Sequence, residues 1–416
     1  MLVSKNCRYL SVIICILIIS LLSGCDYGKP PVEEKVRTEI SLVYPRDGGG
    51  GIMRLLTEYE QLRDDVSIKA FEAAGEKQGY YERLTAVISA GQKMPDILVI
   101  HDTWMPELAE KGILKQLDGI LGSDSLSDFH PGMAEAGRWK GKLFAIPFWQ
   151  DMPLLYYRKD LIDTPLNTWK KLEDAAADLK SQLEIPYGLI FPAESQWNST
   201  VFMTSLLIAY DAMPDFSGQA VSYNEKAISS AFGRLKSLAE KDVLSSDVFN
   251  MGAEKCRQVF SEGNAVFMIN WSYAARLLIK DDSPLKDRVA SAPIPMAGSD
   301  DTYSGLISGW MLTIGSQSKH TALAREVVEY LIRHDNQRRI ALDNGQLPAR
   351  VSLYEEKGWQ DRLHVPEVLS SLLPAGQPAM LGIYSEDLMG QLNSILSKVF
   401  DTETKTSDLL KMLIER

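Results

Sequence analysis

The 416-residue sequence has few cysteines, and it has no excess of basic residues. Its 44 lysines and arginines are outnumbered by 55 aspartates and glutamates, so the formal net charge is −11. A nucleic-acid partner calls for a basic face, and the composition therefore argues against one. Cys7, Cys15 and Cys25 stand near the N-terminus, and only Cys256 is internal. We therefore expect no intramolecular disulfide in the mature protein, whose stability must come from a hydrophobic core.

Catalytic and metal-binding motifs are also missing. The sequence contains no HExxH, GxSxG or CxxC motif, and its five histidines are far apart. The pair His101-Asp102 follows a predicted strand, where the sites of α/β proteins form, but a lone histidine more often makes local hydrogen bonds. Paired carboxylates could still come together in the fold, and sequence spacing does not locate such pairs. We expect no metal, no cofactor and no enzymatic activity.

A run of glycines follows the first predicted strand. Asp47 precedes four consecutive glycines, residues 48–51, at the start of a predicted helix. The run lacks the Gly-Lys-Ser/Thr ending of a nucleotide-binding loop, and it does not fit the full dinucleotide-binding spacing. We interpret it as a turn whose backbone N–H groups lie close to the helix start.

The N-terminus has the features of a signal peptide. Lys5 and Arg8 precede an apolar run, residues 9–22. Such a run has the length of a signal-peptide core and is shorter than the ~20 residues that cross a bilayer as a helix. Leu22-Ser23-Gly24-Cys25 resembles the lipobox of bacterial lipoproteins. An ordinary secretory signal and an uncleaved anchor are the alternatives.

This resemblance implies an exported and lipid-anchored protein. Residues 1–24 would be the lipoprotein signal peptide, and Cys25 would become the lipidated first residue. Residues 25–36 would form the lipid anchor and a polar tether, which contains Pro30 and Pro31. We expect the protein at the cell membrane, facing the periplasm or the cell exterior.

The following segment alternates between strand and helix patterns. Residues 39–44, 66–70 and 96–100 are predicted strands, and apolar residues recur at helical spacing between them. This order predicts a parallel sheet with helices on both faces. The second half also alternates between strand and helix patterns. Strands are predicted at 143–148, 154–157, 187–191, 265–270 and 289–292, and helices at 169–180, 319–332 and from 385 onward.

Tryptophans stand beside polar residues at the ends of several predicted elements. Trp104 follows Asp102, Trp149 precedes Asp151, and Trp271 follows Asn270. A sugar ring offers C–H faces to an aromatic plane and hydroxyls to carboxylates and amides, so these pairs meet both needs. Trp197 and Trp310 are further candidates. Any one of these tryptophans alone is more often a core residue.

Four stretches resemble the extracellular solute-binding proteins of ABC importers, in the group that contains the maltose-binding protein. They are YYERLTAVISAGQKMPDILVIHDTWMPELAEKGILKQLD, WKGKLFAIPFWQDMPLLYYRKDLI with the following TWKKLEDAAADL, FSEGNAVFMINWSYAARLL and SGLISGWMLTIGSQSKHTALAREVVEYLI. They occur in the order of the family, and the resemblance covers nearly all of residues 37–416.

The resemblance implies a type II-like periplasmic binding protein fold, with two doubly wound α/β lobes joined by hinge crossings. The N-terminal lobe would comprise residues 37–149 and 295–345. The C-terminal lobe would comprise residues 150–294 and 346–416. A ligand would lie in the cleft between the lobes, and its contacts in both would favour the closed form.

By motif position, the resemblance places ligand contacts at Asp102, Trp104, Asp151, Trp271 and Trp310. Weaker candidates are Trp149, Trp197, Arg350 and Tyr384. The chain departs from the family after the helix containing Leu206, where Tyr210-Asp211-Ala212-Met213 replaces a common Gly-Gly turn.

The partners implied are a carbohydrate ligand, an ABC permease and, through Cys25, membrane lipid. The chain has no Walker motif, so the ATPase would be another chain. We expect a monomer.

Three hypotheses follow for the activity. The first is a binding protein for sugar import. The second is a carrier of a non-sugar solute such as a polyamine or a metal chelate, because polyamine sites also combine aromatic and acidic side chains. The third is a role outside transport, as a ligand sensor or a lipoprotein enzyme.

Overall fold

The structure is a computed structural model that describes residues 37–415, except for 48, 74–76, 120–125, 164–165, 216–220, 280–282, 299–304, 364–376 and 379–385. The predicted signal peptide, Cys25 and Tyr384 lie outside the described residues. Among those residues, no helix is long and apolar enough to cross a membrane.

The larger of two main sheets has the strand order β12-β6-β11-β3-β1-β2, and β13 also pairs with β11. Its strands are β1 (Thr38–Pro45), β2 (Val66–Ala73), β3 (Ile97–His101), β6 (Ile146–Asp151), β11 (Leu306–Ile314), β12 (Leu347–Pro348) and β13 (Gln377–Pro378). The predicted parallel order holds for β1, β2 and β3. β11 returns antiparallel to β3 and β6, so the sheet is mixed and not wholly parallel as expected.

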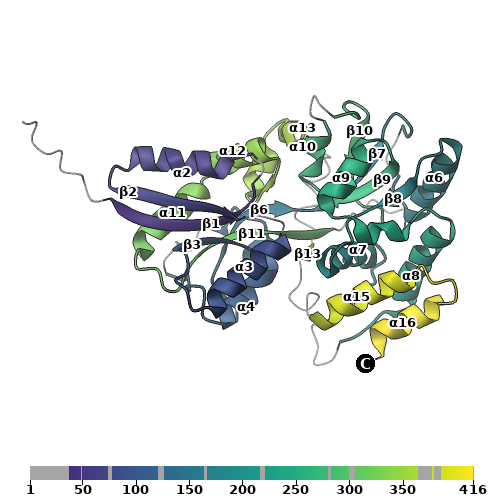
Figure 1. Ribbon diagram of the computed structural model, residues 1–416, viewed down its shortest axis with the longest axis horizontal. Helices are drawn as coiled ribbons and strands as arrows, with labels where there is room; N and C mark the ends of the chain where they lie inside the picture. Colours follow the sequence, from purple (N-terminus) through teal and green to yellow (C-terminus); the bar gives the residue numbers. More distant parts are fainter. Residues whose placement is uncertain are drawn as a thin grey trace, which may run out of the picture.

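Helices cover both faces of this sheet. They are α2 (Gly51–Leu62), α3 (Lys77–Ser89), α4 (Met105–Glu110), α5 (Pro131–Ala136), α11 (Thr321–Leu331), α12 (His334–Asn344) and α13 (Trp359–Leu363). Short 3-10 helices lie at η1 (Asp102–Trp104) and η4 (Val351–Glu355), and β4 (Arg138–Trp139) pairs with β5 (Lys142–Leu143). Figure 1 shows α2 and α12 on one side of the sheet and α3 and α4 on the other.

The alternation along β3 explains this arrangement. Ile97 and Val99 join a core that α2 and α11 cover, whereas Leu98 and Ile100 join a core that includes residues of α3 and α4. Successive strand residues point to opposite faces, so a strand buried on both faces is apolar throughout. We call this sheet and its helices the first lobe.

The smaller sheet has the order β10-β7-β9-β8. Its strands are β7 (Pro153–Arg158), β8 (Tyr187–Ile190), β9 (Ala265–Trp271) and β10 (Val289–Ala292). Around it lie α6 (Trp169–Gln182), α7 (Gln196–Ala209), α8 (Glu225–Glu240), η3 (Ser246–Asn250), α9 (Ala253–Ser261), α10 (Ala274–Leu278), α15 (Glu386–Lys398) and α16 (Thr406–Ile414). We call this group the second lobe; Figure 1 shows it beside the first.

Local sequence signals account for several of these elements. Thr168 caps α6, because its side chain accepts a hydrogen bond from the backbone N–H of Lys171. The carboxylate of Asp47 accepts bonds from the N–H groups of Gly50 (2.8 Å) and Ile52 (3.0 Å). Residues 49–51 therefore form a turn that starts α2, in agreement with the prediction.

The chain passes between the lobes more than once. Only Met152 separates β6 of the larger sheet from β7 of the smaller one, and the chain returns between β10 and β11. After β13 it enters the second lobe again, where α15 packs on α7 and α16 on α8. The predicted fold class, two α/β lobes joined by hinge crossings, is confirmed.

Candidate functional site

The predicted site residues other than Arg350 and Tyr384 lie close to the place where the two lobes meet. In the first lobe, Asp102 and Trp104 follow β3, Asp151 ends β6, and Trp310 lies in β11. In the second lobe, Trp271 ends β9 and Trp197 lies in the first turn of α7. The elements that carry them are far apart in sequence.

Strand pairing brings the first-lobe residues close together. Trp310 pairs with His101 on one side and with Trp149 on the other, and Ser308 pairs with Asp151. The register between β11 and β6 shifts directly after Trp310, and such an irregularity re-aims a side chain. A β-carbon added to Gly309 would lie 2.4 Å from the Trp149 carbonyl oxygen, so only glycine allows this close approach.

Aromatic rings form a continuous cluster around Trp310. Its ring centroid is 5.4 Å from that of Trp104, 5.9 Å from that of Trp149 and 6.0 Å from that of Tyr80. Trp104 and Trp149 are 7% and 2% exposed, whereas Trp310 is partly exposed. The two buried rings therefore fix the position of Trp310, which keeps surface for a ligand. Trp197 and Trp271 are also partly exposed.

His101 connects the aromatic cluster of the first lobe to Trp197 of the second lobe. Its ring lies edge-on to Trp310 and to Trp197, with centroid distances of 5.2 Å in each case. Burial lowers the pKa of His101 to about 4, and the nearby charge of Lys77 acts in the same direction, while Asp102 opposes both. The imidazole is therefore neutral at pH 7.

Hydrogen bonds from its surroundings already occupy the Asp102 carboxylate. Its Oδ1 accepts bonds from the Thr103 N–H (2.8 Å) and the Ser308 hydroxyl (2.9 Å), and it lies 2.7 Å from His101 Nδ1. Its Oδ2 also accepts a bond from the Gly309 N–H, at 3.3 Å. A carboxylate has about four acceptor positions, so most are filled. The contact of Asp102 with a ligand stays a prediction.

Ser308, His101 and Asp102 have the residue types of a hydrolytic triad, but their geometry differs from one. The Ser308 oxygen is 3.3 Å from His101 Nε2 and closer to both oxygens of Asp102, at 2.9 and 3.1 Å. A catalytic serine gives its proton to the histidine, which the carboxylate orients from the far side. Here Ser308 and His101 share one carboxylate.

Asp151 links the lobes. Its Oδ1 accepts a hydrogen bond from the hydroxyl of Ser272, which follows β9, at 3.1 Å. Burial raises the pKa of Asp151 to about 7; the bond from Ser272 opposes this shift, and the Asp102 charge adds to it. Near neutral pH this carboxyl group is therefore divided between its two protonation states.

Lys77 and Tyr80 belong to the site although the sequence analysis did not identify either as a site residue. Lys77 Nζ lies 2.8 Å from the ring centroid of Trp197 and 3.4 Å from the Thr103 hydroxyl. Since Lys77 is in α3 and Trp197 is in α7, this contact joins the lobes. Burial holds the pKa of Lys77 well below its ordinary value, and Asp102 opposes that shift. The sequence does place Lys77 and Tyr80 three residues apart, on the same face of one helix. The structure adds that Tyr80 stacks on Trp310.

Arg350 lies in a different environment. It forms an ion pair with Asp128 (2.8 Å), donates from Nε to the Ile332 carbonyl (2.7 Å), and places its guanidinium over Phe129. These contacts fix the segment after β12, so the structure does not bring Arg350 into the tryptophan cluster.

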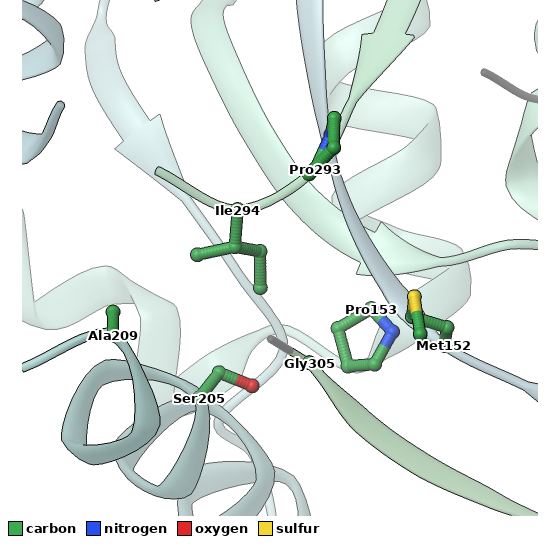
Figure 2. Close-up of a pocket in the computed structure, with 7 residues that line it drawn as sticks. All are labelled: Met152, Pro153, Ser205, Ala209, Pro293, Ile294 and Gly305. Atoms are coloured by element: carbon green, nitrogen blue, oxygen red, sulfur yellow. The ribbon is translucent and has the colours of Figure 1, made fainter. Parts of the chain in front are cut away.

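Two cavities lie near the junction. One is lined by Pro153, Phe191, Pro192, Asn198, Val201, Phe202, Ile269, Asn270 and Trp271. The other lies where the crossing segments meet α7, and Figure 2 shows Ser205 and Ala209 of the helix facing Pro153 and Ile294. Among the described residues, no charged side chain lines either cavity.

Comparison with known proteins agrees with this architecture. A family model described as bacterial extracellular solute-binding protein matches residues 44–338. A probable ABC transporter-binding protein of Deinococcus radiodurans is 27% identical over 274 residues, which cover 63% of this chain and 64% of that protein. A mannitol-binding protein of Pseudomonas aeruginosa is 26% identical over 283 residues, 64% of this chain and 62% of that one. The matches thus span less than two thirds of these relatives.

Solved structures match over a larger part of the chain. Maltose-bound T. maritima MalE3 has a TM-score of 0.76 and 23% identity, covering 90% of this chain and 97% of that one. The GacH receptor of Streptomyces glaucescens has a TM-score of 0.75 and 19% identity, covering 91% and 96%. At such identities the likeness establishes the fold.

Proposed function

The chain belongs to the bacterial extracellular solute-binding proteins, and from this premise we propose that it captures a sugar or oligosaccharide between its lobes and delivers it to an ABC permease. Members of this family bind solutes and are not enzymes, so we assign the site a binding role. The relatives named for mannitol and for an ABC transporter support this choice of ligand and partner.

One observation carries the proposal: partly exposed tryptophans from both lobes meet beside two carboxylates. Trp310 comes from the first lobe and Trp197 and Trp271 from the second, while Asp102 and Asp151 lie at the junction. Aromatic faces suit the C–H surface of a pyranose, and carboxylates accept its hydroxyl protons. Because the contacts come from both lobes, a bound sugar would favour the closed form.

The lobe division predicted from the sequence is part of this proposal. Residues 37–149 and 295–345 would move as one body, and residues 150–294 would move with the C-terminal helices. Since Gln150 and Asp151 belong to β6, which pairs with β11 and β12, we place these two residues with the first body, together with Leu347 and Pro348 of β12. The cavity beside the crossing segments (Figure 2) leaves apolar space where the bodies hinge.

Membrane attachment completes the proposal. Cys25 would carry the lipid, and residues 26–36 would act as a tether that keeps the carrier near its permease. The lipobox-like sequence Leu22-Ser23-Gly24-Cys25 supports this assignment.

A polyamine is the second candidate ligand. It is favoured by Lys77, whose Nζ lies over the Trp197 ring, since the same aromatic face would receive a ligand ammonium. The carboxylates Asp102 and Asp151 would also suit a cation.

A thermal-shift screen of the protein lacking its first 25 residues tests the proposal. Mono- and oligosaccharides, sugar alcohols, polyamines and amino acids are compared. We expect one carbohydrate class to raise the melting temperature saturably. A shift with polyamines alone would replace the ligand class, and no shift with any compound would count against solute capture at this site.

The variant Trp310→Ala links the screen to the site. Losing the ring should weaken the affinity for the sugar found in the screen by about 30-fold or more, because a central aromatic side chain contributes about 2 kcal/mol or more to binding. Trp139→Ala is the control, since Trp139 lies in the β4–β5 hairpin and bonds to Glu110. Equal affinity in the two variants would contradict the placement of the site.

A further inference from the structure

The cavity beside Trp271 has a composition that differs from the rest of the candidate site. Its walls are Pro153, Pro192, Val201, Ile269 and the rings of Phe191 and Phe202, which stack with centroids 3.4 Å apart and planes 4° apart. Phe191, Phe202 and Ile269 are almost completely buried. These walls offer no hydrogen bonds to a sugar hydroxyl, and a hydroxyl buried there would lose its bonds to water.

Two amide side chains line the cavity, and only one is available. The amide nitrogen of Asn270 donates to the Ala253 carbonyl (2.8 Å), and its oxygen accepts the Trp271 N–H (2.9 Å). The side chain of Asn198 is partly exposed and makes no hydrogen bond with any described residue. The cavity thus combines apolar walls with one free donor and acceptor.

This combination fits a small apolar group attached to an amide. A methyl group would be buried against Trp271 and the phenylalanines, while an amide N–H and C=O would pair with the Asn198 amide, which both accepts and donates. An acetamido substituent carries these groups side by side, and its methyl group matches the apolar walls.

The cavity borders the proposed sugar site, because Trp271 belongs to both and Asn198 is the neighbour of Trp197 in sequence. Asn198 follows Trp197, whose ring contacts His101 of the first lobe. Trp271 precedes Ser272, which bonds to Asp151. A sugar ring held between these residues would therefore have its substituents next to the cavity.

We propose that this cavity is a subsite for the acetamido group of an N-acetylated amino sugar, which makes such sugars or their oligomers the preferred ligand class. The inference rests on the proposed sugar-binding function and narrows it. Asn198 is the specificity-determining residue, and Trp271, Phe191 and Val201 form the methyl-binding wall.

Calorimetric titration of the purified protein with matched sugars tests the subsite. N-acetylglucosamine and N-acetylgalactosamine are compared with glucosamine, glucose and galactose, and N,N′-diacetylchitobiose with cellobiose. We expect the acetylated member of each pair to bind about tenfold tighter or more, since it gains a buried methyl group and an amide hydrogen bond.

Variants then locate the preference. Asn198→Ala removes the amide, and Val201→Phe fills the cavity; each should reduce the preference for the acetylated sugar to about threefold or less. Gln196→Ala is the matched control, because Gln196 is an exposed amide in the same turn of α7. If Val201→Phe fails to fold, Asn198→Ala and Gln196→Ala still give the comparison.

The outcomes separate the subsite from the general function. If acetylated and plain sugars bind equally, the subsite is wrong and sugar capture stands. A preference that survives in both cavity variants would place the acetamido group elsewhere and also overturn the subsite. If no sugar binds, the proposed function fails and the subsite fails with it.

Discussion

At the residue scale, the two carboxylates of the site have opposite surroundings. Asp102 is enclosed by donors from η1 and β11 that stabilise its charge. Asp151 accepts a hydrogen bond from the Ser272 hydroxyl and faces the charge of Asp102. Asp102 is therefore best placed to orient the loop around Trp104, whereas Asp151 keeps acceptor positions for a ligand hydroxyl.

The raised pKa of Asp151, about 7 against an ordinary 3.8, predicts a pH-dependent stability. A raised carboxyl pKa favours the folded state while the group is protonated. This contribution is complete below pH 4, falls between pH 4 and 7 as the unfolded chain loses its proton first, and levels off above pH 7. The slope is at most about 1.4 kcal/mol per pH unit and smaller for a partly exposed group.

Urea unfolding of the parent protein and of Asp151→Asn at several pH values checks this. The parent-minus-variant difference in the free energy of unfolding should decrease as the pH rises from 4.5 to 7. Taking the difference cancels the contribution of the many carboxylates whose pKa is lowered by ion pairs and whose effect on stability has the opposite sign, because that effect is the same in both proteins. A difference that does not change with pH would contradict the assignment to Asp151.

At the scale of elements, the sequence predicted what depends on local patterns. The apolar run of β3 and the helical spacing in α2 each lie within one segment, and each element formed where expected. The antiparallel return of β11 was missed, because its pairing with β3 and β6 joins segments more than 150 residues apart.

The same limit applies to the site. Tryptophans at element ends could be read from the sequence, but the filled state of Asp102 depends on Ser308, 206 residues away. The role of Lys77 depends on α7, which packs from the other lobe. Contacts of this kind arise from tertiary packing and leave no periodic pattern in the sequence.

The contact between α3 and α7 predicts an effect on lobe opening. Lys77→Met keeps the apolar stem and removes the amine over Trp197, so it removes a contact of about 0.5–2 kcal/mol that exists only when the lobes meet. The open form should gain about 2- to 30-fold relative to the closed form. Small-angle X-ray scattering without ligand should show a larger radius of gyration.

Lys69→Met is the matched control for this experiment. Lys69 Nζ lies 5.6 Å from the ring centroid of Phe71, and both residues belong to β2. This substitution removes a cation–π contact inside one strand and should leave the radius of gyration unchanged. The same change in both variants, or none in either, would argue against a contact that holds the lobes together.

Lys236 predicts a stability effect where α8 meets the C-terminal helices. Its buried Nζ donates to the carbonyl oxygen of Val399 at 3.1 Å and also to that of Asp401. Lys236→Met leaves both carbonyls without this donor and should lower the free energy of unfolding by about 2–3 kcal/mol. Chemical denaturation measures it, with the exposed Lys226→Met on the same helix as the control. Equal stability of the two variants would show that the lysine does not anchor the segment between α15 and α16.

At the scale of the whole molecule, the site depends on the way the chain passes between lobes. β6 ends at Asp151, and β7 begins two residues later in the other lobe. Asp151 is therefore part of both the proposed ligand site and a crossing, and its bond to Ser272 forms only when the second lobe is near. A ligand that contacts Asp151 would thus act directly on the segment about which the lobes turn.

The proposed membrane attachment concerns the whole molecule, and it depends on one thiol. If Cys25 is acylated, the full protein should partition into the detergent phase of a Triton X-114 extract and incorporate radiolabelled palmitate. Cys25→Ser should lose the label, because serine offers no thiol for the lipid. Cys256→Ser is the control, since Cys256 is buried in the second lobe, where burial raises its thiol pKa and keeps it unreactive. Label retained in Cys25→Ser would refute lipidation at this position, whereas label lost there alone would assign the anchor to Cys25. An anchored carrier stays within reach of a permease in the same membrane, so the attachment raises its effective concentration near that permease. The length of the tether, residues 26–36, sets how large this concentration is.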